Sequence, residues 1–356
     1  MSIYIYNLNL YFMEKYKDKG FTGLTNLGNT CFLNSCMQAL NHTYELNEFL
    51  SSKEYRVYLK KTLPDATILE EWKNLQKVMW SQNGVVSPNR FVHYVQQLAV
   101  KKDRDLFTGY AQNDLPEFLL FVIDCMHNSL SRKVKLHIKG HVENSTDKLA
   151  TSCYQMLQKT YANEYSEIMN MFYGIYVSEL TNANDSNVLS VNPEPYFILD
   201  LEIPDKNASI YDCFNAFTAH EVLEGENAWM NEKTGKKEDV KKRITFWNFP
   251  SILIITFKRF HIDGSRKLQN MIDFPLDGLD LSKYISGYNA RSYIYDLYAV
   301  CNHSGGTMGG HYTAFVKNVS SEWVHYNDTR VDRHIPVNKI VTPKAYCIFY
   351  RKRTKV

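Results

Sequence analysis

Apolar residues recur with helical spacing through the first third of the chain. Over residues 31–42 they follow one another at intervals of three and four positions, which predicts an amphipathic helix. The same spacing predicts helices over residues 68–80, 87–98 and 113–130, of which the last holds an apolar run at 118–126. Such a run indicates a buried helix, so the chain opens with a helical layer.

The pattern changes in the second half of the chain. Segments rich in Val, Ile, Tyr and Phe, separated by turn residues, predict strands there. The predicted strands cover residues 195–203, 251–260, 293–303, 311–318 and 345–353. Helices that come first and strands that come later predict an α+β fold, with a binding cleft between the two parts.

Three segments fit neither pattern. Residues 131–165 are polar and irregular, with a loop at "ENSTD". Residues 231–243 predict a charged hairpin or loop with Gly235 at its turn. Residues 1–19 predict a short leader that ends in the charged "MEKYKDK".

Charge and hydropathy narrow the class of protein. The chain of 356 residues carries a net charge of +3, which is too small to indicate nucleic acid or a membrane surface as a partner. No stretch approaches the roughly 18 apolar residues of a membrane span. The first residues, "MSIYIYNLNLYF", lack the basic start and apolar run of a signal peptide. We therefore expect a soluble protein with no membrane or nucleic-acid partner.

The seven cysteines are scattered, and no two of them form a Cys-x-x-Cys pair. An odd, scattered set speaks against a disulfide framework and against a thiolate zinc site. Free thiols are typical of a reducing compartment, so we expect an intracellular protein of the cytoplasm or nucleus.

One cysteine stands where a reactive sulfur would be useful. The stretch "GLTNLGNTCFLNSCMQAL" places Cys31 at the start of the first predicted helix, where unpaired N–H groups and the helix dipole lower the pKa of a thiol. Asn26 lies on the approach loop, and its amide could donate to an oxyanion beside the sulfur. The alternative is that Cys31 is only a small buried hydrophobic residue.

A thiolate needs a base, and one histidine has an unusual context. In "NHSGGTMGGHYTAF" two glycine pairs frame a turn that delivers His311 at the start of a predicted strand. Asn327 and Asp328 follow at the end of the next segment, and either could orient the imidazole. A surface histidine and an ordinary Asn-Asp turn are the alternatives. Jointly, the order Cys, His, Asn favours a papain-type cysteine hydrolase that acts through an acyl-enzyme thioester.

These segments resemble the ubiquitin-specific proteases. "GLTNLGNTCFLNSCMQAL" resembles the cysteine box of that family, and "YAVCNHSGGTMGGHYTAFVKN", followed by "WVHYNDTRV", resembles its histidine box. "GYAQNDLPEFLLFVID" and "SILIITFKRF" are similar to two landmarks between the boxes. The resemblance covers residues 20–351, nearly the whole chain.

The resemblance implies a papain-like fold with palm, thumb and fingers. It implies a catalytic domain at residues 20–351, with thumb helices at about 20–130, palm and fingers sheets at about 165–351, and a basic tail at 352–356. It also implies thiol-dependent hydrolysis of the isopeptide or peptide bond after the C-terminal glycine of ubiquitin. The expected partners are ubiquitin and ubiquitinated proteins, and we expect a monomer.

The resemblance assigns roles residue by residue. Cys31 matches the nucleophile, His311 the general base, Asn327 the third catalytic residue, Asn26 the oxyanion-hole residue and Asp328 a neighbouring acid. The weight between Asn327 and Asp328 stays open.

A second group matches substrate-binding positions. Asp114 and Glu117 match acidic residues that contact the basic tail of ubiquitin, and a carboxylate can hold an arginine in bidentate fashion. The alternative for this pair is a charge and capping role at a helix start. We expect Gly309, Gly310 and Tyr312 to contact the last residues of that tail, in a channel too narrow for bulkier chains.

The sequence departs from the family at the fingers. Many members hold zinc there with two Cys-x-x-Cys pairs, whereas this chain has Asn231 and Thr234 at the second pair of positions. We therefore expect no zinc and no other cofactor. The segment "QNDLPEF" also differs from the commonest residues, although its acidic positions remain.

Three functions compete at this point. The first is an active deubiquitinating peptidase, and the second is a catalytically silent scaffold that only binds ubiquitin. The third is a papain-like peptidase for ordinary polypeptides. The sequence keeps Cys31, His311 and Asn26, which favours the first.

Overall fold

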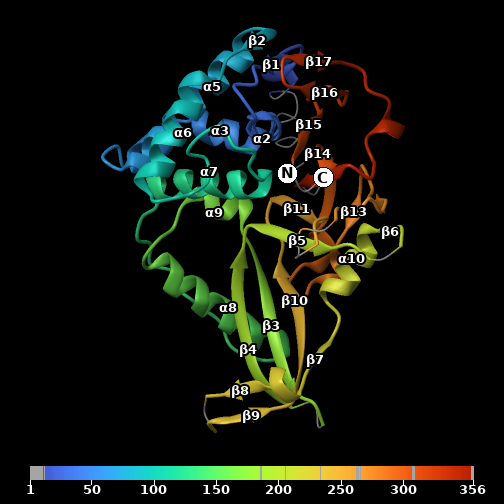
Figure 1. Ribbon diagram of the computed structural model, residues 1–356. Coiled ribbons are helices and arrows are strands. Elements are labelled where there is room, and N and C mark those ends of the chain that lie inside the picture. Colours follow the sequence, from blue (N-terminus) through green and yellow to red (C-terminus); the bar gives the residue numbers. More distant parts are fainter. Residues whose placement is uncertain are drawn as a thin grey trace.

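The fold has a helical lobe, a sheet lobe and a long arm of strands that extends from the sheet lobe (Figure 1). The computed structural model describes residues 11, 13–184, 187–204, 206–232, 234–261, 264, 266–306 and 309–353. Most of the predicted leader, at residues 1–10 and 12, and the end of the predicted basic tail, at 354–356, lie outside the described residues.

The helical lobe contains the four predicted helices and two short ones. Two three-residue strands, β1 and β2, pair in parallel at its edge. The elements are β1 (Thr22–Leu24), α2 (Cys31–Asn41), α3 (Tyr44–Ser51), α4 (Tyr55–Tyr58), α5 (Pro64–Ser81), β2 (Gly84–Val86), α6 (Asn89–Lys101) and α7 (Leu115–Leu130). The helices predicted over 31–42, 68–80, 87–98 and 113–130 are α2, α5, α6 and α7.

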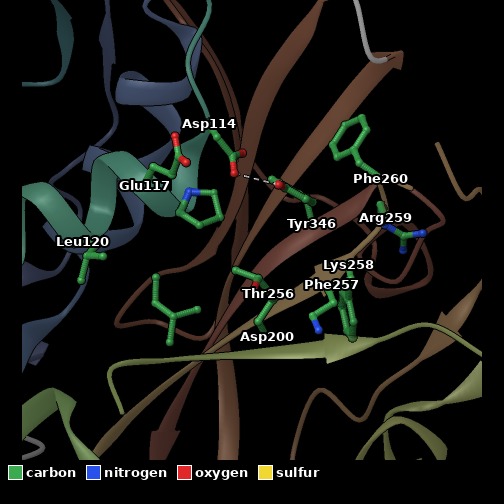
Figure 2. Close-up of a pocket in the computed structure, with 12 residues that line it drawn as sticks. Asp114, Glu117, Leu120, Asp200, Thr256, Phe257, Lys258, Arg259, Phe260 and Tyr346 are labelled. Carbon is green, nitrogen blue, oxygen red and sulfur yellow. Dashed lines mark hydrogen bonds between the residues drawn. The ribbon is translucent and has the colours of Figure 1, made fainter. Parts of the chain in front are cut away.

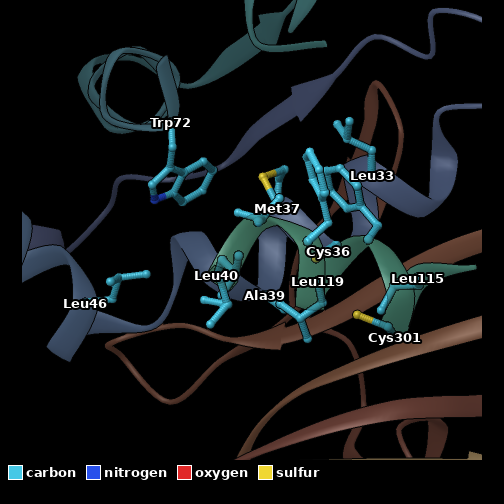
Figure 3. Packing of buried hydrophobic residues seen from close by; sticks show 14 of the residues in the cluster. Leu33, Cys36, Met37, Ala39, Leu40, Leu46, Trp72, Leu115, Leu119 and Cys301 are labelled. Atoms are coloured by element: carbon cyan, nitrogen blue, oxygen red, sulfur yellow. The ribbon is translucent and has the colours of Figure 1, made fainter. Parts of the chain in front are cut away.

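Helix α2 is buried on all sides, although its sequence predicts an amphipathic helix. All of its residues are buried, including the polar Asn34, Gln38 and Asn41. Figure 3 shows its apolar side chains packed between Trp72 of α5 and Leu119 of α7. The polar residues that looked like a solvent face instead contact other parts of the fold, as the Gln38 amide does when it donates to the Thr22 carbonyl.

The sheet lobe is built on one eight-stranded sheet. Its strands are β5 (Ile198–Glu202), β11 (Ile252–Lys258), β13 (Leu279–Asp280), β14 (Ile294–Gly306), β15 (Gly309–Lys317), β16 (Trp323–Asn327), β17 (Arg330–Asp332) and β18 (Ala345–Lys352). They follow the order β17-β16-β15-β14-β18-β11-β5, and β13 pairs with β14. The five predicted strand segments are all confirmed, and α2 packs directly against β14 and β15.

The arm is a four-stranded antiparallel sheet, with strands in the order β4-β3-β10-β7, and a small hairpin near its end. The strands are β3 (Gly174–Asn182), β4 (Val188–Tyr196), β7 (Glu221–Leu223), β8 (Trp229–Asn231), β9 (Lys236–Glu238) and β10 (Val240–Asn248). The predicted hairpin at 231–243 is confirmed for β8 and β9, which turn at Gly235 with a φ of +67°. Its last residues belong to β10 instead.

The interpretation of residues 131–165 as irregular is wrong. They contain α8 (Ser145–Tyr161), which packs on β4 at the side of the arm. The "ENSTD" segment is the start of this helix, because the Asn144 side chain accepts a hydrogen bond from the Asp147 N–H. The helix escaped notice because it buries only Ala150 and Cys153 and so lacks a broad apolar face.

The remaining elements are short. They are α9 (Glu167–Phe172), α10 (Ile210–Phe217), β6 (Ala208–Ser209), which pairs with β12 (Ile272–Asp273), and 3-10 turns at Gly225–Asn227, Ser282–Tyr284, Ala290–Ser292 and Val337–Lys339. Among the helices in the described ranges, none combines the length and apolar character that crossing a bilayer requires.

Candidate active site

Cys31 is the first residue of α2 and lies against β15. Its side chain is buried, with 3% of the residue exposed. Three backbone N–H groups hydrogen-bond with its sulfur, those of Cys31 and Phe32 at the helix start and that of Tyr312 on β15. The contact with Tyr312 places the sulfur beside the residue that follows His311.

The expected fall in the pKa of this thiol is wrong for the substrate-free molecule. Burial raises the pKa of the Cys31 thiol above its ordinary value, the three N–H groups oppose that rise, and the nearby charge of Asp328 adds to it. The helix start acts as predicted, but the loss of hydration outweighs it. A thiolate here therefore needs a group that accepts the proton at close range.

His311 and Asn327 form the orienting pair that the sequence suggested. The imidazole Nε2 lies 2.7 Å from the Asn327 Oδ1, across the hydrogen-bonded hairpin of β15 and β16. Because the amide oxygen only accepts, Nε2 carries the hydrogen and Nδ1 is left as the basic nitrogen. This tautomer is the one that a proton acceptor for a neighbouring thiol requires.

Asp328 has different partners from its neighbour. Its carboxylate accepts hydrogen bonds from the amides of Asn26 (3.0 Å) and Asn34 (2.8 Å). Its backbone has a φ of +50°, and its carbonyl accepts from the Leu24 N–H. Asp328 therefore fixes the loop before Cys31 and the first turn of α2, while Asn327 faces the imidazole.

Asn34 is a residue of this cluster that the sequence interpretation missed. Its amide also approaches the carbonyls of Leu24 and Thr25, at 3.3 and 3.4 Å. A signal was available, since Asn34 follows Cys31 by one helical turn and therefore shares its face of a buried helix. A polar residue in that position needs partners, and the loop and Asp328 provide them.

Asn26 organises the approach loop that precedes Cys31. Its Oδ1 accepts from the N–H groups of Gly28 and Thr30, both at 3.1 Å, which folds the loop over its own side chain. Its Nδ2 donates one hydrogen to Asp328. The second hydrogen of that amide is the one that an oxyanion could accept.

Two adjoining pockets form a groove beside the strand that bears His311. One has a volume of about 400 Å³ and the other of about 700 Å³, and both are lined by Asp114, Phe260 and Tyr346. The larger pocket also contacts Gly309 and Tyr312 on the histidine-bearing strand. The groove is therefore lined by four of the five predicted substrate contacts, which are Asp114, Glu117, Gly309 and Tyr312.

Asp114 lines this groove from the N-cap position of α7. It is the residue before α7 but makes no side-chain cap bond there. Its two carboxylate oxygens accept from the hydroxyls of Tyr312 and Tyr346, each at 3.0 Å, and the second of these bonds is drawn in Figure 2. These bonds, and not a capping bond, engage the Asp114 side chain, although the residue stands at the helix start and Glu117 lies in the first turn.

Three carboxylates, those of Asp114, Glu117 and Asp200, line the smaller pocket, which Lys258 and Arg259 also line. Burial raises the pKa of Asp114, with a smaller contribution from Asp200 that opposes the effect of the tyrosine hydroxyls. Burial and the charge of Asp114 raise the pKa of Glu117 as well. Figure 2 shows Asp114 and Glu117 on the helix side of the pocket, across from Asp200. Crowded carboxylates of this kind favour a cationic ligand, which would relieve their repulsion.

The comparisons with known proteins agree with this geometry. The family model described as ubiquitin carboxyl-terminal hydrolase matches residues 22–350. Ubiquitin carboxyl-terminal hydrolase 2 of Homo sapiens is 36% identical over 350 residues, which cover 95% of this chain and 56% of the relative. The corresponding protein of Gallus gallus is 34% identical over 343 residues, with 93% of both chains covered.

This chain belongs to the ubiquitin carboxyl-terminal hydrolase family. It is a ubiquitin-specific protease by family, as the sequence motifs indicated, although it spans only 56% of the length of the first relative named above. A chain of the SAGA Ubp8/Sgf11/Sus1/Sgf73 module, solved with ubiquitin aldehyde, is similar with a TM-score of 0.73 and 25% identity. The match covers 97% of this chain and 71% of that one, which confirms the papain-like fold.

Two groups beneath the groove were not singled out from the sequence. The Lys267 ammonium lies 2.9 Å from the His303 Nδ1 and 2.6 Å from the His303 carbonyl. Burial, with the charges of Lys267 and His311, lowers the pKa of His303 to about 4. His303 is therefore a neutral, buried support for the histidine-bearing hairpin, where it pairs with Tyr312.

The tip of the arm, where family members can hold zinc, is closed by hydrogen bonds. Asn231 and Thr234 both donate to one oxygen of Glu238, at 2.9 and 3.0 Å. Within the described ranges, no group of three or more His, Cys, Asp or Glu residues is placed to hold a metal ion. All seven cysteines are buried free thiols.

Proposed function

We propose that this chain is a deubiquitinating cysteine peptidase that hydrolyses the bond after the C-terminal glycine of ubiquitin. The observation that carries the proposal is the joint placement of Cys31, His311 and Asn327. The sulfur hydrogen-bonds with the backbone of the residue after His311, and Asn327 holds the imidazole in the tautomer that accepts a proton. Family membership supplies the substrate class.

The first chemical step joins proton transfer to attack. His311 takes the thiol proton at Nδ1, and the Cys31 sulfur adds to the carbonyl carbon of the terminal glycine. The resulting oxyanion accepts hydrogen bonds from the Asn26 amide and from the backbone N–H of Cys31. Asp328 supports this step indirectly, because it fixes the Asn26 side chain at 3.0 Å.

The second half of the reaction releases the two products in turn. The imidazolium of His311 protonates the leaving amine, and the tetrahedral adduct collapses to a thioester on Cys31. Water, deprotonated by the same imidazole, then attacks the thioester and releases the ubiquitin carboxylate. Asn327 stabilises the imidazolium during both halves.

The groove supports recognition of a basic, glycine-ended tail. Asp114 and Glu117 offer carboxylates to its arginine side chains, and Gly309 and Gly310 leave room for its last glycines. Tyr312 contributes by holding Asp114 in place. Burial raises the pKa of both carboxylates, and a bound cation would lower it again by stabilising their charged forms.

A ubiquitin probe with a C-terminal electrophile tests the proposal. Wild-type protein should form a covalent adduct that shifts by one ubiquitin mass, and Cys31→Ala should form none. Cys36→Ala is the matched control, because that thiol is buried in α2 and should not affect labelling beyond any loss of fold. An adduct that persists in Cys31→Ala contradicts the assigned nucleophile.

The same experiment separates the competing functions. A silent scaffold would bind ubiquitin without forming an adduct. An ordinary peptidase would cleave unfolded polypeptides and ignore the probe. A panel of ubiquitin dimers, with one ubiquitin-like fusion as control, then gives the linkage and modifier preference.

We also propose that the fingers hold their shape without zinc. The hydrogen bonds from Asn231 and Thr234 to Glu238 support this, because they close the hairpin at the place where thiolates would bind metal. Metal analysis of the purified protein should find far less than one equivalent of zinc. About one equivalent, lost with unfolding on chelation, would refute this part.

The domain bounds, the oligomeric state and the compartment form a separate proposal. We propose a catalytic domain at residues 20–351 that acts as a monomer on ubiquitinated proteins in a reducing compartment. The buried free thiols support the compartment. Light scattering of the purified chain, with and without ubiquitin, tests the monomer against the multi-subunit arrangement of the similar SAGA module.

A further inference from the structure

One edge of β15 stays open next to the nucleophile. On its other edge, β15 pairs with β14 along residues 309–316. On the edge next to Cys31, β15 pairs with β16 from Ala314 onward, and no strand within the described ranges pairs with Gly310 or Tyr312 there. Residues two apart in a strand direct their backbone groups to the same side, so Gly310 and Tyr312 share this edge.

Two side chains satisfy the open edge instead of a strand. The Tyr312 N–H hydrogen-bonds with the Cys31 sulfur. The Gly310 N–H donates to the Gln112 Oε1 at 2.7 Å, and the Gly310 carbonyl accepts from the Gln112 Nε2 at 3.2 Å. A side-chain amide that both accepts from and donates to one residue reproduces the pairing of a peptide unit on a neighbouring strand.

The backbone at this point is shaped to admit that amide. Gly309 has a φ of +149°, and a Cβ atom there would lie 2.9 Å from the Gln112 Oε1. Gln112 comes from the segment before α7, so its two hydrogen bonds to Gly310 cross from the helical lobe to the sheet lobe. Its Nε2 also donates to the Asn29 Oδ1, at 3.5 Å. It also lines the larger of the two pockets, together with Tyr312.

We propose that Gln112 is a positioning residue. In the free enzyme its side-chain amide takes the place of a substrate peptide unit on the edge of β15, and the amide leaves that place when the tail of the substrate enters. This rests on the proposed function. In the free enzyme the amide holds the strand that bears His311. An extended tail that reaches Cys31 must pass this edge, and its own N–H and C=O can replace the amide at Gly310.

The exchange makes entry conditional on backbone pairing. A tail without side chains at its end can approach Gly310 as closely as Gln112 does. A bulkier chain would displace the amide without making the two replacement hydrogen bonds, and so would leave Gly310 unpaired. Gln112 thereby adds to the selection for a glycine-ended tail at no cost to the cleavage step.

Kinetics of Gln112→Ala test the exchange. With ubiquitin that carries a C-terminal fluorogenic amine, the variant should lower KM by about three- to tenfold, because the competing hydrogen bonds are gone. Its kcat should change less than about twofold. Gln96→Ala is the matched control, since the Gln96 amide donates to the Gly109 carbonyl of the same loop but does not contact β15.

Binding measurements isolate the tail. In the Cys31→Ala background, Gln112→Ala should tighten binding of intact ubiquitin by the same factor. It should leave unchanged the binding of ubiquitin that lacks its two terminal glycines. Gln112→Glu keeps the acceptor for the Gly310 N–H and loses the donor to its carbonyl, so it should lower KM by a smaller factor than alanine.

Each other result overturns the inference. A higher KM would make Gln112 a substrate contact, and a lower kcat at constant KM would mean that it stays on Gly310 during turnover. Unchanged values of KM and kcat would mean that the hydrogen bonds between Gln112 and Gly310 do not affect substrate binding. If wild type and Cys31→Ala bind no ubiquitin at all, the proposed function itself fails, which is a different result.

Discussion

The catalytic corner, where α2 meets β15, and the fingers tip, formed by the β8–β9 hairpin, are stabilised in opposite ways. Every residue of α2 is buried, and its apolar side chains belong to the largest hydrophobic cluster of the described residues. Of the six residues in strands β8 and β9, Asn231 is buried, whereas Lys236 and Lys237 are exposed. The tip is stabilised by backbone pairing and a few polar side chains.

The difference matches what each region has to do. Proton transfer requires groups fixed to within a fraction of an ångström, and close packing provides that because small displacements leave voids or clashes. A surface that only grips a partner tolerates movement. The comparison teaches that this protein concentrates its packing where chemistry happens and leaves polar hydrogen bonds to close the tip.

The largest effect is expected when one tryptophan in each region is replaced by alanine. Trp72 is fully buried behind α2, while Trp229 at the tip is only partly buried. Trp72→Ala should lower the free energy of unfolding by about 3–5 kcal/mol, and Trp229→Ala by about 1 kcal/mol or less. Denaturant titration of both variants measures the difference, and equal losses would contradict the comparison.

The next test acts within the catalytic corner. Asn327→Ala removes the acceptor for the His311 Nε2 and should lower kcat by about a hundredfold. Asp328→Ala frees the amides of Asn26 and Asn34 and should lower kcat by roughly tenfold, because the Asn26 amide loses its fixed position. The loss of the Asp328 charge, which raises the pKa of Cys31, acts in the opposite direction and limits this effect. A stronger effect from Asp328→Ala than from Asn327→Ala would reverse the roles assigned here.

The ionisation of Cys31 gives a smaller and more specific effect. Burial raises the pKa of this thiol, so at any given pH a smaller fraction is thiolate than for an exposed cysteine. Alkylation by iodoacetamide in the substrate-free enzyme should therefore rise through a pH range above that of a free cysteine. Mass spectrometry of the Cys31 peptide follows the rate, with reduced glutathione as the reference thiol.

A plateau of that rate at acidic pH would mean that His311 already holds the proton as an ion pair. In that case the burial of Cys31 would not dominate its chemistry.

The smallest effect is expected at the fingers tip. Glu238→Ala removes the acceptor for Asn231 and Thr234 and should destabilise the hairpin locally by about 1 kcal/mol. Hydrogen exchange of the β8 and β9 amides should speed up while kcat stays the same. Glu232→Ala, at an exposed position beside them, is the control and should leave the exchange unchanged.

Much of the fold followed from local patterns. The spacing of apolar residues located α2, α5, α6 and α7, and the β-branched and aromatic runs located five of the eight strands of the main sheet. Helix α8 was missed because its sequence is polar, and only the Asn144 cap marked its start. Apolar residues at helical spacing reveal a helix only when one of its faces is buried. This signal is therefore weak for α8, which covers the side of a narrow arm.

The candidate site was predictable in its members but not in their partners. The sequence indicated Cys31, His311 and a choice between Asn327 and Asp328. The structure brings Asn327 to the imidazole and Asp328 to two asparagines. It also adds Gln112, whose hydrogen bonds to Gly310 join residues 198 positions apart.

The sequence by itself determined the local elements, the cysteine at a helix start, the histidine at a strand start and the missing Cys-x-x-Cys pairs. These depend on backbone preferences and residue types that neighbours in the chain fix. Only the tertiary structure decided that burial raises the pKa of Cys31, that Asp114 faces two tyrosines, and that Asn26 bonds with Asp328 across 302 positions. Hydration and hydrogen-bond partners are properties of the packed chain, because segments far apart in sequence remove the water and supply the donors.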